Sequence, residues 1–361
     1  MTRLEIPEIF ELIADGLPVR EVDLSGLDFS GLDLSRAVFL NCNASGTRFS
    51  ETRAEGALFK GCTLDGSNWS RAKIVKAAFL DCDLSEGLFA EIDGTLSRWI
   101  SPKLANARFD RAVLNRAAFI RGDFGKSVFT EASLEKASFV ESRFSQTDFS
   151  GARIVKTVYV KPDLFGCQFS GATFQNPIFV KGSLRGLDFS GMRLPMIQAS
   201  GCDLSGTRWV GSDVSLGNFY QSDLSGADFS RAVGGKALFT ESILGGVSAP
   251  GARLSMASFQ KVDASGADFS GADLSLSPWT EARCIETDFS NANLAFSDFS
   301  HADLSSAIFQ GASLGRATFH RARESTADFT GSTRTLAREA DPERGEAEDF
   351  QPRIFESQEA P

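Results

Sequence analysis

Few residues of this chain combine a reactive side chain with the spacing that chemistry would require. The only two histidines, His301 and His320, have no triad partner and no metal-ligand cluster around them in the sequence. We expect both to face outward. Residues 311–315 read Gly-Ala-Ser-Leu-Gly, which matches the nucleophile-elbow string of hydrolases, but no strand-to-helix turn is predicted there. The sequence therefore predicts a protein that is not an enzyme and that uses no metal or cofactor.

The six cysteines favour an intracellular protein with free thiols. Five of them stand two positions before a large apolar residue, where most other occupants are Ala, Ser, Thr or Gly. We interpret them as small apolar fillers of the core. A metal site or a disulfide remains an alternative, but no histidine and no Cys-x-x-Cys pair accompanies them. The five are Cys42, Cys62, Cys82, Cys167 and Cys202, whereas Cys284 occupies the position of a large residue.

A strict five-residue repeat must position all of these side chains. From Leu24 to Phe329 every fifth residue is mostly large and apolar, over 62 consecutive pentapeptides without an insertion. These central positions hold 32 of the 38 aromatic residues, including all four tryptophans. A period of five fits neither a long helix nor a long strand. Because burial of these side chains is the strongest apolar signal, the central residue and the small residue two before it should point inward.

Columns of residues 20 apart are homogeneous, which predicts a coil of four pentapeptides with a corner every five residues. Two aromatic columns should face each other across the core, with two mainly aliphatic columns between them. About 15 coils spaced by about 4.8 Å would make a rod about 75 Å long. One aromatic column contains Phe29, Phe49, Trp69, Phe89 and Phe109, and the other contains Phe39, Phe59, Phe79, Trp99, Phe119 and Phe139.

The motif Ala-Asp-Leu-Ser at residues 272–275 and 302–305 resembles the repeat of the pentapeptide-repeat family. The resemblance covers most of the chain and implies an all-β fold, a right-handed quadrilateral β-helix. This sequence departs from the family motif by placing Phe instead of Leu at about half of the central positions. We expect that departure to change the width of the core and not its topology.

The sequence divides into three parts. Residues 1–20 show helical spacing of apolar side chains and are predicted to be a short capping helix with a lead-in. Residues 21–332 form the solenoid, with a local kink expected where small residues underfill the core around residues 234–250. Residues 333–361 are predicted to be a charged, largely disordered tail, although Phe350, Ile354 and Phe355 could dock back as a partial cap.

One face of the predicted rod departs from the polar surface pattern. Outward positions that are Ser, Thr or Gly elsewhere are aliphatic here, beside a run of basic residues that turns apolar in the later coils (Met196, Leu216, Met256, Leu276, Phe296). An exposed apolar column beside a basic ridge indicates a binding surface. The alternative is that β-branched residues merely suit a β-face. The predicted partner-binding residues are Leu40, Leu80, Ile100, Ile120, Val140, Val160, Val180, Arg116, Lys136 and Lys156.

The net charge of −10 is uneven, since residues 101–200 carry 14 basic and 8 acidic side chains. We therefore expect a non-catalytic, rod-like protein-binding scaffold or adaptor, able to self-associate, associated with a bacterial secretion system or acting as an effector. No direct binding of nucleic acid is expected. The alternative comes from resemblance to fluoroquinolone-resistance pentapeptide proteins, which implies an acidic DNA mimic that inhibits or protects DNA gyrase, a type II topoisomerase. The sequence shows no secretory signal and no membrane span, so a cytoplasmic location is expected unless a signal-independent system exports the chain.

Overall fold

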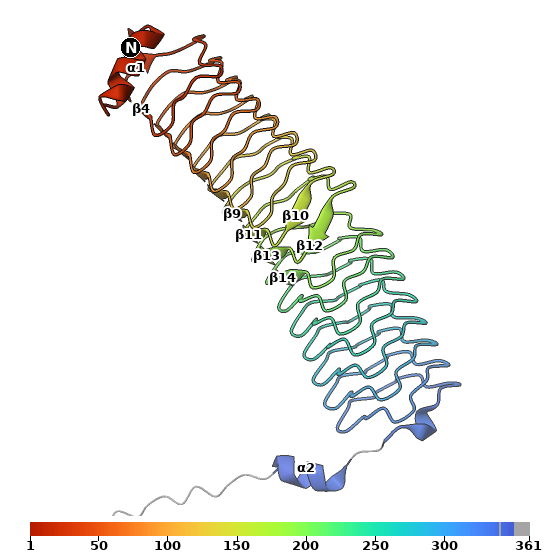
Figure 1. Cartoon of the computed structure of the whole chain (residues 1–361). Coiled ribbons are helices and arrows are strands. Elements are labelled where there is room, and N and C mark those ends of the chain that lie inside the picture. The colour runs from red at the N-terminus through yellow and green to blue at the C-terminus, as the bar shows by residue number, and fades with distance from the viewer. Residues whose placement is uncertain (339–340, 350–361) are drawn as a thin grey trace, which may run out of the picture.

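The chain folds into a long stack of four-sided coils (Figure 1). The structure is a computed structural model and describes residues 1–338 and 341–349. Ten short parallel strands, one from each successive coil, form a continuous sheet along one side of the stack. They are β2 (Val19–Arg20), β4 (Val38–Leu40), β5 (Leu58–Lys60), β6 (Ala78–Leu80), β7 (Arg98–Ile100), β8 (Ala118–Ile120), β9 (Ser138–Val140), β11 (Val158–Val160), β13 (Ile178–Val180) and β14 (Gln198–Ser200).

Each coil pairs with the next through residues 20 positions apart. In the sheet, Phe39 lies opposite Phe59. On another side, fifteen successive single-residue bridges lead from Asp23 to Arg323 in steps of 20. A corner every five residues leaves each side at most a few extended residues, so strands are short or reduced to bridges. The quadrilateral β-helix is confirmed. Its continuous sheet covers ten coils, fewer than the 15 expected, and single bridges extend the pairing beyond it.

The corners place ordinary L-amino acids in the left-handed backbone region. Arg36, Leu96 and Met196 each have a φ of 61°. This conformation costs a residue that is not glycine about 1–2 kcal/mol. The hydrogen-bonded ladder offsets that cost, because the corner amides donate to the next coil, as the Arg36 N–H does to the Glu55 carbonyl at 2.9 Å.

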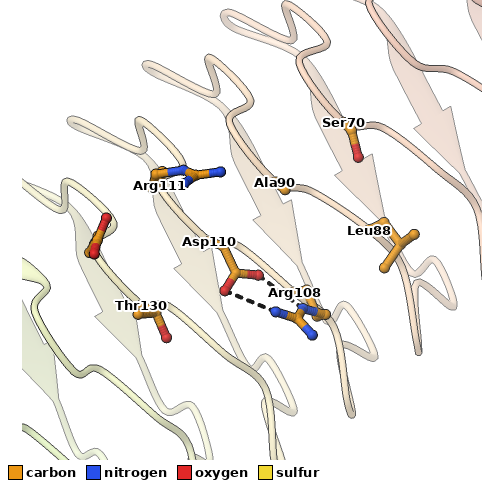
Figure 2. A pocket seen from close by; sticks show the side chains of 8 residues that line it. Ser70, Leu88, Ala90, Arg108, Asp110, Arg111 and Thr130 are labelled. Carbon is orange, nitrogen blue, oxygen red and sulfur yellow. Dashed lines mark hydrogen bonds and ion pairs between the residues drawn. The ribbon is translucent and has the colours of Figure 1, made fainter.

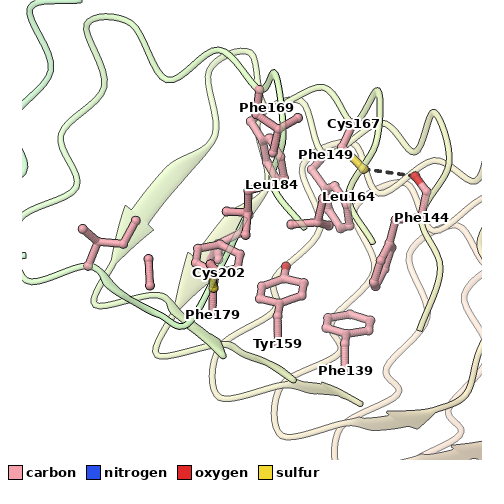
Figure 3. Packing of buried hydrophobic residues seen from close by; sticks show 14 of the residues in the cluster. Phe139, Phe144, Phe149, Tyr159, Leu164, Cys167, Phe169, Phe179, Leu184 and Cys202 are labelled. Carbon is pink, nitrogen blue, oxygen red and sulfur yellow. Dashed lines mark hydrogen bonds between the residues drawn. The ribbon is translucent and has the colours of Figure 1, made fainter. Parts of the chain in front are cut away.

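Stacked aromatic rings fill the core as the sequence predicted (Figure 3). Phe139 is fully buried between Phe119 and Tyr159, with ring centroids 4.9 and 5.1 Å away. The opposite column meets it edge-on, since the Phe129 ring lies 6.4 Å away at an interplanar angle of 89°. All six cysteines are free and buried, so they fill space in the core as expected.

Short elements lie at the two ends of the stack. Helix α1 (Ile6–Ala14) begins with a capping box between Glu5 and Glu8, and its Ile9 is fully buried in the solenoid core. Strand β1 (Thr2–Arg3) pairs with β3 (Val22–Asp23). At the other end lie the 3₁₀ helix η1 (Arg334–Leu336) and helix α2 (Pro342–Asp349), both within the range expected to be a largely disordered tail. Phe350, Ile354 and Phe355 lie outside the described residues. No helix among the described residues is long and apolar enough to cross a membrane.

The ladder opens at one place, which is not where the sequence analysis placed a kink. Pairing continues unbroken through Ser248, and only a small void adjoins Ala249. Instead, within the described chain, no backbone hydrogen bond joins residues 166–176 to residues 185–195. Strand β12 (Thr173–Gln175) pairs with β10 (Arg153–Val155) on one side only. Phe174 is the sole aromatic residue in its aliphatic column and is partly exposed. The ladder therefore opens at the coil that places a ring in an aliphatic column, and not at the coils with small central residues.

Candidate protein-binding surface

The predicted aliphatic residues form one aligned column on the continuous sheet. Each is the last residue of its strand and is partly exposed. The register sets Ile120 beside Val140, Val140 beside Val160, and Val160 beside Val180. Lys60 interrupts the column early in the chain. We call this column the apolar stripe: Leu40, Leu80, Ile100, Ile120, Val140, Val160 and Val180.

The corner that precedes each strand of this sheet carries the three predicted basic residues. Arg116, Lys136 and Lys156 are exposed, with φ values of 58°, 57° and 50°. We call corner column the series that starts at Arg36 and takes every twentieth residue as far as Arg316. Five of its later members are apolar and exposed: Met196, Leu216, Met256, Leu276 and Phe296, with exposures of 47%, 52%, 48%, 52% and 51%.

These later corner residues extend the candidate surface beyond the predicted site. The sequence pattern revealed their spacing, but the predicted site ended at Val180. The structure shows that they are more exposed than the residues of the apolar stripe, which are all partly buried. One edge of the rod is therefore largely basic in its first half and largely apolar in its second half.

Charges on the basic part of the edge are only partly neutralised. Lys136 Nζ lies 3.7 Å from Glu135 Oε1, and Arg153 donates to Glu135 Oε2 at 2.8 Å. The hydrogen bond from Arg153, opposed in part by desolvation, lowers the pKa of Glu135. Among the described residues, Arg116 and Lys156 form no ion pair within 4.0 Å. These two cations remain available to carboxylates of a partner.

A shallow hollow lies where the corner column meets the sheet. It has a volume of about 460 Å³, and its lining joins Lys76, Leu96 and Arg116 of the corner column to Arg98 and Ala118 of the strands. Aliphatic side chains therefore lie beside lysine and arginine side chains in the same hollow. Such a surface can accept an apolar side chain next to an acidic one.

A hollow on a different side of the rod shows the contrast (Figure 2). It has a volume of about 510 Å³, and Arg108 contacts Asp110 within it through two hydrogen bonds of 3.0 and 3.2 Å. Arg111 of the same hollow pairs with Glu91 on the preceding coil. These charges satisfy one another, so this side offers less to a charged partner than the corner column does.

The two histidines correct one expectation. His301 is exposed, but His320 is buried, and their ring centroids lie 5.6 Å apart. Glu348 of α2 approaches both rings, a contact that the sequence could not indicate because Glu348 lies outside the repeat. Ser313 of the Gly-Ala-Ser-Leu-Gly string lies inside a regular coil, paired with Asn293, and is not on a strand-to-helix turn.

Family models match much of the chain. A pentapeptide repeat region matches residues 20–89. Pentapeptide repeats in groups of eight copies match residues 127–157, 167–206, 200–233, 237–275 and 282–323. The chain belongs to the pentapeptide-repeat family. No match was found among curated proteins.

Several solved structures resemble this chain at low sequence identity. Trypsin-treated QnrB1, a plasmid-mediated fluoroquinolone resistance protein, is 19% identical over 44% of this chain and 92% of its own, with a TM-score of 0.31. HetL, involved in heterocyst differentiation regulation in the cyanobacterium Nostoc sp. strain PCC 7120, is 20% identical over 91% and 96%, with a TM-score of 0.18. A thylakoid-lumen protein of Arabidopsis thaliana is 20% identical over 35% and 68%, with a TM-score of 0.14.

Proposed function

We propose that this protein is a non-catalytic rod that binds a protein partner through the apolar stripe and the corner column. The observation that carries the proposal is the alignment of both columns along one edge of the rod. Successive stripe residues are paired in register through the sheet. The corner residues beside them stay exposed despite the cost of a left-handed backbone. Left-handed corner residues occur on every side of the rod, so the feature that favours a function over simple β-propensity is the basic and then apolar character of this one corner beside an aliphatic column.

The charge on this edge favours an acidic partner with apolar side chains. Complete burial of an aliphatic side chain contributes about 1.5–3 kcal/mol, and a partly buried stripe residue would contribute roughly a third of that. Several stripe and corner residues together would supply several kcal/mol of gross stabilisation. Carboxylates of the partner would pair with Arg116 and Lys156, which raises the association rate and fixes the register.

Self-association fits the same surface less well. In an antiparallel dimer, the basic first half of one corner column would lie against the apolar second half of the other. The cations Arg116, Lys136 and Lys156 would then lose water without gaining carboxylates, which is unfavourable. A different acidic protein is therefore the preferred occupant, and a dimer is the competing result of the experiment below. An adaptor or an effector delivered by a bacterial secretion system would use this surface in the same way.

The test replaces two stripe residues with lysine in the full chain, as Val140→Lys with Val160→Lys. Both side chains point outward at strand ends, so we expect the fold to remain. Capture of the partner from the native host, or dimerisation by light scattering, should fall at least tenfold, because two charges would enter an apolar contact. The matched control is Thr130→Lys with Ser150→Lys, at the equivalent half-buried positions after the other aromatic column.

Two outcomes contradict the proposal. If the variant with Val140→Lys and Val160→Lys folds and still binds everything that the original chain binds, the stripe reflects only β-propensity. If the control variant loses binding equally, the effect is general to added charge and not to this face. Circular dichroism and light scattering on both variants separate these outcomes from loss of the fold.

The DNA-mimic alternative makes a different prediction. A mimic should inhibit or protect gyrase. The effect should weaken with added salt, because salt screens the attraction between an acidic rod and the basic DNA-binding groove of the enzyme. The basic corner residues Arg36, Lys76, Arg116, Lys136 and Lys156 disfavour such mimicry. We therefore expect no change in gyrase supercoiling at any salt concentration, and a salt-sensitive inhibition would favour the alternative.

A further inference from the structure

Three metal-ligating side chains converge where the C-terminal helix meets the last coils. His301 and His320 come from adjacent coils, and Glu348 comes from α2. Nε2 of His301 and Nε2 of His320 each lie 3.2 Å from Oε2 of Glu348. All three donor atoms lie within 4.8 Å of one another. His320 is buried, whereas the side chains of His301 and Glu348 are 34% and 28% exposed, so solvent reaches the cluster at these two residues.

Apolar packing does not hold α2 in this position. None of its residues is buried. Its contacts with the solenoid are polar: Arg321 donates to Asp349 at 2.6 and 3.0 Å and to the Gly345 carbonyl at 2.7 Å. Arg344 also reaches Ser300 Oγ at 3.4 Å. An isolated eight-residue helix is marginal in water, so its attachment depends on these groups and on the cluster around Glu348.

We propose that His301, His320 and Glu348 bind one divalent transition-metal ion of the zinc type, which fastens α2 to the last coils. Two imidazole nitrogens and one carboxylate oxygen are a donor set that suits Zn²⁺ and leaves a position for water. Two ligand atoms on one tetrahedral ion lie about 3.4 Å apart when each bond is about 2.1 Å. The 3.2 Å separations from Glu348 are close to that value. The two histidine nitrogens lie within 4.8 Å of each other, so they must approach by at most about 1.4 Å.

The second oxygen of Glu348 is already held by a neighbour. Arg344 Nε donates to Glu348 Oε1 at 2.8 Å, four residues away on the same helix. This contact leaves Oε2 directed at the two histidines. A hydrogen-bonded carboxylate of this kind is typical of metal ligands, because the outer contact fixes the orientation of the ligating oxygen.

Metal binding requires two local rearrangements, and the first of them can be observed. The backbone N–H of Asp341 donates to Nδ1 of His320 at 3.2 Å, so the proton of the neutral ring is on Nε2. An ion bound to Nε2 requires that proton to move to Nδ1, and the contact with Asp341 is then lost. Arg321 Nε, 3.6 Å from Glu348 Oε2, must also turn away. Zinc should therefore shift the amide resonance of Asp341.

The experiment titrates the full chain with Zn²⁺ alone, by calorimetry and by equilibrium dialysis. We expect one ion per chain. His301→Ala and Glu348→Gln should each weaken binding at least about 100-fold, since each removes a ligand and outer-shell losses alone cost about 10–100-fold. Glu348→Gln keeps a hydrogen-bonding acceptor for both rings, so it separates metal ligation from a simple hydrogen-bonded contact. Arg344→Ala should weaken binding about tenfold. The matched control is Glu346→Gln, because Glu346 is an exposed residue of α2 whose side chain forms no hydrogen bond or ion pair with the other described residues; it should change the affinity less than threefold.

Substitution of Co²⁺ for Zn²⁺ identifies the ligands independently. The visible spectrum should show nitrogen and oxygen ligation without the thiolate charge-transfer band that a cysteine site would give. The proposal is overturned if the original chain binds zinc no more tightly than His301→Ala or Glu348→Gln, or if the thiolate band appears. It is also overturned if zinc binds without moving the Asp341 amide.

Discussion

Replacement of Phe139 by alanine tests the stacked core quantitatively. Its ring is fully buried between Phe119 and Tyr159 and meets Phe124 and Phe144 edge-on at 5.7 and 5.2 Å. Removal of a buried Phe costs about 3–5 kcal/mol, and the upper half of this range applies because coils held by ladders above and below cannot collapse into the void. The loss of two stacked contacts adds to the cost.

Hydrogen exchange is the appropriate assay, because long repeat arrays do not unfold in one step and a single unfolding free energy is not defined for them. Since about 1.4 kcal/mol corresponds to a factor of ten in an equilibrium constant, amides of strands β8, β9 and β11 should exchange roughly 10³- to 10⁴-fold faster. Amides several coils away should change far less, because each coil contacts only its neighbours.

Phe174→Ala is the matched control, since Phe174 is also a central aromatic residue but lies in the open ladder and is partly exposed. Its nearest rings, Phe169 and Phe189, lie 5.5 and 6.5 Å away in tilted and edge-on orientations. Local exchange should accelerate less than it does for Phe139→Ala. Equal acceleration in both variants, or a change of less than tenfold around Phe139, would refute the reasoning about packing.

Three further predictions concern charge, thiols and shape. Hydrogen bonds from Ser30 and then Arg48 lower the pKa of Asp28 to about 2. A carboxyl with a lowered folded-state pKa stabilises the fold above its unfolded pKa, so the onset of thermal unfolding should move to lower temperature as the pH drops from about 4 to 2. A move to higher temperature over that interval would contradict this. Burial raises the pKa of the Cys167 thiol to about 12, so the native protein at pH 8 should react slowly with a thiol reagent. All six cysteines should react after unfolding, and rapid reaction of the native protein would be inconsistent with a closed core. Small-angle scattering should show a rod, and a compact sphere would be incompatible with the stacked coils.

The repeat predicted most of the fold because every position of a coil is constrained in the same way. A large residue every five positions specifies the corner, and homogeneous columns every 20 positions specify the stacking. The burial of Trp69 and Phe139 and the free, buried cysteines follow from that pattern. The outward alignment of Ile120, Val140 and Val160 was predicted for the same reason and is seen in the register of the sheet.

Features that depend on a mismatch between neighbouring coils could not be read from the period. Gly234 and Ala249 suggested a kink, yet small residues leave only a minor void when the ladder on every side is intact. Phe174 satisfies the five-residue pattern, but it is the only ring in its column and the ladder opens beside it. The burial of His320 depends on α2, which has no repeat and shows no apolar periodicity.

The central claim is that a protein partner lies against the apolar stripe, and photo-crosslinking in the native host tests it most directly. A photoreactive amino acid placed at Val140 should crosslink to one discrete acidic protein, while the same group at Ser150, on the side of the other aromatic column, should not. Identical crosslinks from both positions, or none from Val140 in cells that express the protein normally, would contradict the claim.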